Sequence, residues 1–207
     1  MAEATSAWRR PLLYWRLAAW AIALLPAVHL AKWIAQAKLG ANPVETLEHY
    51  TGLWGLRLLL LCLAMTPLRK LIRRPEPIQI RRLLGLWAFA WLCVHFVIYL
   101  TFDLEWSPVQ LAEDLVKRTY ITLGFVGWLL LLPLAITSTR GWQRRLKRAW
   151  SRLHTLVYAA ALLGGLHFFW LVKSDVREPL LYLTLYGLLM AARIPGAILR
   201  APKKPAQ

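Results

Sequence analysis

Acidic residues are scarce in this chain, which has 10 aspartates and glutamates against 26 lysines and arginines and a formal net charge of +16 over 207 residues. A strongly positive balance is typical of nucleic-acid-binding proteins and of membrane proteins with basic loops. The basic residues of this chain lie between long apolar runs. The charge pattern therefore favours a membrane protein that contacts a lipid bilayer and argues against a nucleic-acid-binding protein.

Cysteine is also scarce, and the two present, Cys62 and Cys93, both lie inside apolar runs. They form no Cys-x-x-Cys motif, and we expect them to be small packing residues. The sequence has no glycine-rich phosphate loop and no His-Glu-x-x-His zinc motif. These absences remove motif-based support for a nucleotide-binding, thiol or zinc enzyme.

Apolar residues are abundant: they make up 58% of the chain, above the roughly 45–50% usual in soluble domains. They form six helix-length segments, at residues 12–30, 53–68, 83–100, 121–136, 153–172 and 180–199. Helices of about 20 residues cross a bilayer and satisfy their own backbone polar groups there. The first segment has no small-residue cleavage site after it, so we interpret it as a span. The sequence predicts an all-α membrane protein, a bundle of six transmembrane helices in a single domain over residues 1–207.

The basic residues alternate between the two sides of these segments. Most lie before the first segment, after the second, after the fourth and after the sixth, whereas most acidic residues lie in the other three loops. Basic loops of membrane proteins stay in the cytoplasm. The pattern predicts that both termini are cytoplasmic and that the chain is a multi-pass protein of the bacterial inner membrane.

Two of the five histidines are predicted to lie at the same depth. From Leu83 to His95 the rise is about 18 Å, and from Leu153 to His167 it is about 21 Å, at about 1.5 Å per residue. Both segments run from inside to outside, so the two imidazoles are predicted in the outer half of the bilayer. They are either axial ligands of one haem or core histidines hydrogen-bonded to neighbouring helices.

His154 lies at the inner end of the same segment as His167. Thirteen residues of straight helix separate their side chains by roughly 140°, so they share a face only if the helix is distorted near the Gly164-Gly165 pair. Arg81 is predicted below His95 on the same face, near the height of His154. It either holds a haem propionate or flavin phosphate or is a positive-inside anchor, which we favour.

His29 and His49 fall near the ends of their segments, where hydration is easy, and structural roles are expected for both. Trp91 and Tyr99 lie one helical turn on either side of His95, and Gly164 and Gly165 precede His167. Aromatic and small neighbours of this kind suit a flat macrocycle.

Several runs resemble a known family. They are the run from Gly40 to Gly52, the run Arg81-Arg82-Leu-Leu-Gly-Leu-Trp87, His95, the segment from Trp150 to His154, and His167. Together they resemble the MsrQ (YedZ) family, which belongs to the ferric-reductase-like transmembrane group. The resemblance extends from about residue 10 to about residue 195 and rests most on the Arg-Arg run and the spaced histidines.

The resemblance implies an electron-transfer subunit whose substrate chemistry belongs to a partner. Members pass electrons from a cytoplasmic flavin reductase or quinol, through FMN and one or two b-type haems, to a periplasmic molybdopterin-containing subunit that reduces methionine sulfoxide in envelope proteins. By the same resemblance, His95, His154 and His167 match positions that ligate haem iron. Arg81 and Arg82 match positions associated with flavin binding.

Two other functions remain open from the sequence. One is a ferric reductase or quinol-oxidising cytochrome b that works without the sulfoxide reductase partner. The other is a structural or transport bundle without a cofactor, whose histidines are packed in the core. Coloured purified protein would argue against the second.

Overall fold

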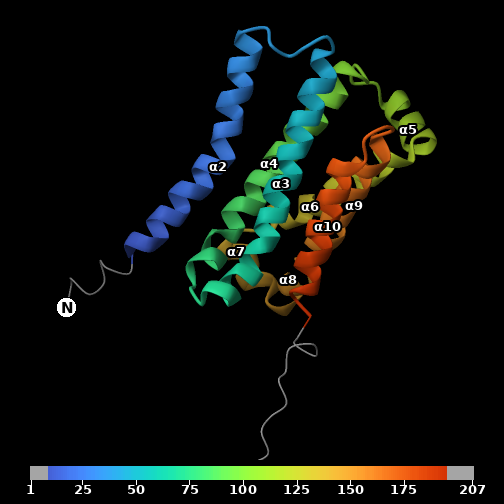
Figure 1. Cartoon of the computed structure of the whole chain (residues 1–207). Helices are drawn as coiled ribbons and strands as arrows, with labels where there is room; N and C mark the ends of the chain where they lie inside the picture. The colour runs from blue at the N-terminus through green and yellow to red at the C-terminus, as the bar shows by residue number, and fades with distance from the viewer. Residues whose placement is uncertain (1–8, 195–207) are drawn as a thin grey trace, which may run out of the picture.

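The computed structural model describes residues 9–194, and side chains from residue 11 onward. Within this range every regular element is a helix (Figure 1). The helices are α2 (Arg9–Ala35), α3 (Pro43–Ile72), α4 (Glu76–Phe102), α5 (Pro108–Lys117), α6 (Thr119–Ile136), α7 (Arg140–Leu146), α8 (Arg148–Leu153), α9 (Leu156–Leu171) and α10 (Arg177–Ala191). The all-α prediction is confirmed for the described residues.

Five helical stretches are long and apolar enough to cross a membrane: α2, α3, α4, α6, and α8 together with α9. The chain is therefore a multi-pass membrane protein. The predicted sixth span corresponds to α10, which has only 15 residues. Residues 195–199 of that predicted span, with Pro195, lie outside the described residues. The sixth span and the cytoplasmic position of the termini stay predictions.

Local sequence explains where several helices begin and end. Asn42 precedes α3 and its side chain accepts a hydrogen bond from the backbone N–H of Glu45 at 3.3 Å, with Pro43 in the first turn. Ser107 caps α5 in the same way, followed by Pro108. Such caps satisfy N–H groups that have no partner within the helix. At the other end of α3, Arg73 adopts a left-handed conformation (φ 56°) that turns the chain into α4.

The core of the bundle consists of two closely packed helix pairs, α3 with α4 and α6 with α9. The two pairs meet through α4 with α6 and α3 with α9, so α4 and α9 lie on a diagonal of the bundle. The most buried side chains of the core come mainly from α3 and α4, and include Leu58, Leu63 and Leu84. α4 and α9 are the two helices that carry His95 and His167.

α2 packs on the edge of this bundle, against α4 (Figure 1). Its buried side is narrow and includes Ala19 and Ala23, whereas Leu13, Leu17 and Leu25 are exposed. Small residues let two membrane helices approach closely. Trp91 of α4 fixes the contact, because its indole N–H donates to the Ala23 carbonyl at 3.1 Å.

Two arginines attach α10 to α3. The Arg57 Nε donates to the Tyr182 hydroxyl at 2.8 Å, and its guanidinium lies 3.5 Å from the Glu178 carboxylate. Near the other end of α10, Arg193 donates to the backbone carbonyl of Leu63 and lies over the ring of Tyr158. A charged group in a span needs such partners. The contacts with Tyr182 and Glu178 therefore explain how α3 tolerates Arg57 in its middle.

The bundle has two ends of different charge. We call the end where α3 passes into α4 the basic end; α7 and α8 follow α6 at this same end (Figure 1). The first described turn of α2 and the last of α10 also lie there (Figure 1). The opposite end carries the α2–α3 connection, α5 and the α9–α10 connection (Figure 1). α5 is a short amphipathic helix that the sequence reasoning did not anticipate.

Candidate functional site

His95 projects from α4 onto a glycine of the adjacent helix α3. Its Nδ1 lies 2.9 Å from the backbone carbonyl oxygen of Glu48. A methyl group added at Gly52, one turn further along α3, would stand 3.1 Å from the same Nδ1. A carbonyl only accepts hydrogen bonds, so Nδ1 carries the proton and the other ring nitrogen, Nε2, keeps a free lone pair.

His167 has the same arrangement on the other helix pair. Its Nδ1 lies 2.6 Å from the carbonyl oxygen of Tyr120 at the start of α6. A methyl group added at Gly124 would stand 2.7 Å from this Nδ1. The lone pair of His167 is therefore also left on Nε2. In metal-binding histidines, a hydrogen bond from the second ring nitrogen usually sets the tautomer in this way.

The two imidazoles lie close together across the diagonal of the bundle. Their ring centroids are 6.2 Å apart, with an angle of 75° between the ring planes. Two imidazoles that bind one metal ion from opposite sides, each through a nitrogen about 2 Å away, have centroids roughly 6 Å apart. By exposed surface, both residues are half-buried. The spacing and the free nitrogens fit a pair of axial ligands to one haem.

The glycines that seat the two imidazoles are Gly52 and Gly124, which the sequence reasoning did not single out as site residues. Glycine weakens a helix by about 1 kcal/mol relative to alanine, so a glycine inside an apolar span indicates a close contact with a neighbouring group. This feature of the sequence could have identified Gly52 and Gly124. The predicted small neighbours have other contacts. A methyl group at Gly165 would stand 2.7 Å from Leu183 of α10, and one at Gly164 would stand 3.7 Å from Leu56.

The aromatic residues predicted beside His95 hold α4 in place. Trp91 is bonded to α2, as described above. The Tyr99 hydroxyl donates to the Asp114 carboxylate of α5 at 2.7 Å. Both side chains therefore brace the helix that carries His95.

His154 lies apart from this pair, in the turn between α8 and α9. Its ring stacks on Trp150 with centroids 3.9 Å apart, and its Nδ1 lies 3.0 Å from the Trp150 carbonyl oxygen. α9 is continuous at Gly164 and Gly165, so the distortion that would let the two histidines share a face does not occur there. The helix is interrupted at His154 and Thr155 instead, so the straight-helix angle between His154 and His167 does not apply.

Arg81 and Arg82 lie in the first turns of α4, at the basic end. Arg81 is half-buried and Arg82 is exposed. The backbone carbonyl of Arg81 accepts a weak hydrogen bond from the Cys62 thiol at 3.3 Å. Arg81 also lies near His154.

The remaining histidines have partners at the opposite end. The His29 Nδ1 lies 3.3 Å from the Tyr50 hydroxyl. His49 lies 3.9 Å from the Glu178 carboxylate and against Phe168. Neither ring takes part in the His95–His167 pair. Across the described residues, no three histidine, cysteine, aspartate or glutamate side chains group as a metal cluster.

The sequence matches a family of membrane proteins over the region that contains most of this site. The family model described as "Ferric reductase like transmembrane component" matches residues 51–165. This range includes His95, His154, Arg81 and both seating glycines, and ends just before His167. No solved structure matches the chain.

Individual relatives carry a more specific name. The chain is 57% identical over 156 residues to the "Protein-methionine-sulfoxide reductase heme-binding subunit MsrQ" of Xanthomonas euvesicatoria, covering 75% of this chain and 72% of the relative. The protein of the same name from Caulobacter vibrioides is 45% identical over 177 residues, which is 84% of each chain. At this identity and coverage, the chain belongs to the MsrQ family of ferric-reductase-like transmembrane proteins.

Proposed function

We propose that this chain is the haem-binding electron-transfer subunit of a methionine sulfoxide reductase system in the bacterial inner membrane. The observation that carries the proposal is the pair of imidazoles 6.2 Å apart, each with Nδ1 hydrogen-bonded to a backbone carbonyl. The names of the MsrQ relatives, which state haem binding, support the same assignment.

His95 and His167 would hold the haem iron, each through Nε2. When bound, haem supplies a one-electron carrier that alternates between ferric and ferrous iron. The Glu48 and Tyr120 carbonyls hold each imidazole in the required tautomer, and the seating glycines allow each ring to lie close to the neighbouring helix. Backbone atoms of α3 and α6 thus hold both rings in position.

A second cofactor region is proposed at the basic end. His154, Arg81 and Arg82 are the candidate residues there, with FMN or a second haem as the bound group. An arginine pair offers bidentate hydrogen bonds to a phosphate or propionate. The half-buried position of Arg81 near His154 supports such a role more than the exposed position of Arg82 does.

The proposed donor is a cytoplasmic flavin reductase or quinol, and the proposed acceptor is a periplasmic molybdopterin-containing catalytic subunit. This chain then needs no substrate-binding site for methionine sulfoxide. Its own residues position the carriers, and the partner performs the reduction of oxidised envelope proteins.

The test begins with visible spectra of the purified chain before and after dithionite, with haem extraction on the same sample. We expect a b-type signal that disappears in His95→Ala and in His167→Ala. His29→Ala is the matched control, because that ring contacts Tyr50 outside the pair. Normal haem content in both His95→Ala and His167→Ala would refute the assignment of ligands.

The sulfoxide reductase role needs a separate measurement. Reduced protein in nanodiscs is mixed with the oxidised periplasmic catalytic subunit, and haem reoxidation is followed by stopped flow. Rapid reoxidation that requires the partner supports the proposal. Reoxidation by ferric chelates alone, with no acceleration by the partner, would favour a ferric reductase.

The flavin contacts are tested with Arg81→Ala combined with Arg82→Ala. We expect flavin content to fall more than haem content, since these side chains lie away from the His95–His167 pair. Arg144→Ala combined with Arg145→Ala removes the same charge from α7 and should leave flavin content unchanged. Equal flavin content in both double variants would contradict the role of Arg81 and Arg82.

A further inference from the structure

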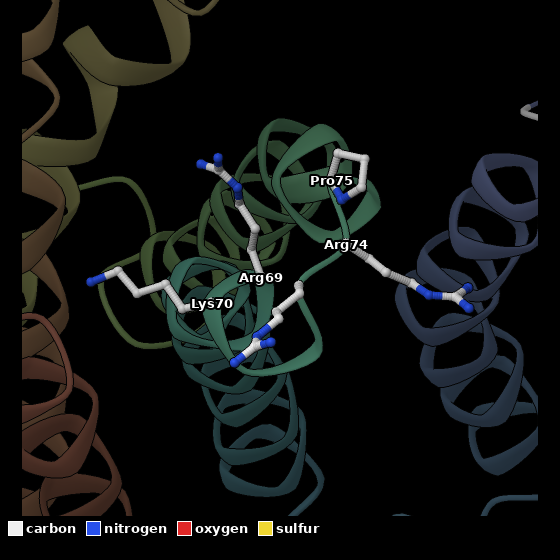
Figure 2. A pocket seen from close by; sticks show the side chains of 5 residues that line it. Arg69, Lys70, Arg74 and Pro75 are labelled. Atoms are coloured by element: carbon white, nitrogen blue, oxygen red, sulfur yellow. The ribbon is translucent and has the colours of Figure 1, made fainter.

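An open hollow lies at the turn between α3 and α4, at the basic end, and four of the five residues that line it are cationic (Figure 2). The hollow has a volume of about 450 Å³ and is lined by Arg69, Lys70, Arg73, Arg74 and Pro75. The labelled side chains spread around the turn, and Arg74 extends toward α2 (Figure 2). None of the residues assigned to haem or flavin lines this hollow.

The backbone creates this concentration of charge. α3 ends at Ile72, Arg73 turns the chain with φ 56°, and α4 begins at Glu76. The tight turn keeps Arg73 and Arg74 beside Arg69 and Lys70, which lie in the last turn of α3. The C-terminal end of α3 carries a partial negative charge of about half an electron, which favours cations there. This partial charge is too small to neutralise four positive side chains.

None of the four cations forms an ion pair with a described residue of the chain. Among the described residues, no carboxylate lies within 4.0 Å of any of the four cations. Glu76, the acidic residue closest in sequence, forms no ion pair with them. All four side chains are exposed. An anion from outside the chain is therefore the natural counter-charge.

The position of the hollow indicates the source of that anion. The turn joins two membrane-spanning helices, so it lies at the level of the lipid headgroups. Leu71, within the same cluster, is 80% exposed, and a leucine at this level is stabilised by contact with acyl chains. Basic clusters beside a span attract anionic lipids, at about 1 kcal/mol per residue.

The geometry points to a binding site for the headgroup phosphate of an anionic phospholipid, formed by Arg69, Lys70, Arg73 and Arg74. Arginine offers planar, bidentate hydrogen bonds to phosphate, and lysine adds a point charge. Leu71 would contact the acyl chains of the same lipid. This site is independent of electron transfer and needs no haem.

The experiment uses the full chain purified in a neutral detergent. Dioleoylphosphatidylglycerol is titrated into it, and binding is followed by native mass spectrometry and by the thermal shift in tryptophan fluorescence. The test variant combines Arg69→Gln, Lys70→Gln, Arg73→Gln and Arg74→Gln. We expect its apparent Kd for the lipid to rise at least about tenfold, while haem content stays unchanged.

The matched control combines Arg140→Gln, Arg144→Gln, Lys147→Gln and Arg148→Gln. It removes the same charge from the same end of the bundle, around a hollow of similar volume, about 420 Å³, that Arg140, Gln143 and Arg144 line. We expect its Kd to rise less than about threefold, because only two cations line that hollow, against four at the α3–α4 turn. Equal weakening in the two variants would overturn the site in favour of a general charge effect.

Two further arms identify the ligand. Dioleoylphosphatidylcholine bound as tightly as phosphatidylglycerol would overturn the requirement for an anionic lipid. Inorganic phosphate is the second arm. If it raises the Tm as much as phosphatidylglycerol does, and no longer does so in the test variant, the ligand is a free anion and the lipid assignment is overturned. If the variant with four substitutions fails to fold, the double variant Arg73→Gln with Arg74→Gln replaces it. An unchanged Kd of the double variant for phosphatidylglycerol would refute the site.

Discussion

The imidazole of His167 lies directly against Gly124 of α6, and a methyl group added at Gly124 would stand 2.7 Å from its Nδ1. A side-chain carbon does not approach a ring atom that closely, so Gly124→Ala must displace the ring. We expect at least about tenfold weaker haem binding, the range seen when groups that orient a metal ligand are lost. Gly52→Ala, with its contact of 3.1 Å, should weaken binding less.

Gly187→Ala is the control for this pair of variants, because a methyl group there meets no atom within 4 Å. Haem affinity is measured by titrating haemin into apoprotein and following the Soret band. Unchanged affinity in Gly124→Ala would contradict the contact between α6 and His167.

His154→Ala distinguishes the two proposed cofactor regions. His154 stacks on Trp150 and lies apart from the pair, so we expect the variant to keep the b-type signal that depends on His95. A haem held by His154 would be lost from the same sample. The pyridine haemochrome assay gives the haem-to-protein ratio for His154→Ala and for His95→Ala. Complete loss of haem in His154→Ala, with the protein still folded, would show that His154 supports the main site.

Arg57→Gln should loosen α10. The variant loses the hydrogen bond to Tyr182 and the ion pair with Glu178, whose side chain is 43% exposed. Partial exposure limits the loss to about 1 kcal/mol, or a Tm decrease of about 2–4 °C for a chain of this size. The control is Arg177→Gln. The Arg177 side chain is 94% exposed, and its contact with Asp175 is long, at 4.0 Å. An equal Tm in the two variants, measured by scanning fluorimetry, would contradict the role of Arg57.

Asp114→Asn should free α5 from the bundle. The Asp114 carboxylate accepts from the Tyr99 hydroxyl at 2.7 Å and pairs with Arg118 at 3.3 Å. Neutralising it weakens both contacts, so backbone amides of residues 108–118 should exchange with deuterium several-fold faster. Glu113→Gln is the neighbouring control, because Glu113 pairs only with the exposed Lys117. Exchange is followed by mass spectrometry in detergent, and equal protection in both variants would argue that α5 is held by other contacts.

The sequence by itself determined the fold class and most of the helices. Long apolar runs cannot be buried by 207 residues in water, and a single helix satisfies its own backbone in lipid. The closeness in level of His95 and His167 also followed from the sequence, because the rise per residue of a helix is fixed and their rings lie 6.2 Å apart. Residue spacing does not report which helices pack together, so neither the partners of the two imidazoles nor the direction of their rings was predicted.

Only the tertiary structure decided those points. The Glu48 and Tyr120 carbonyls come from helices other than those of the histidines they orient, and helix packing brings them together. The break at His154, the helix α5 and the contacts of Arg57 with α10 depend in the same way on neighbouring segments. The amino-acid sequence determines the composition of each helix and the spacing of residues along it. The site is formed between helices, where side-chain packing selects one arrangement among many.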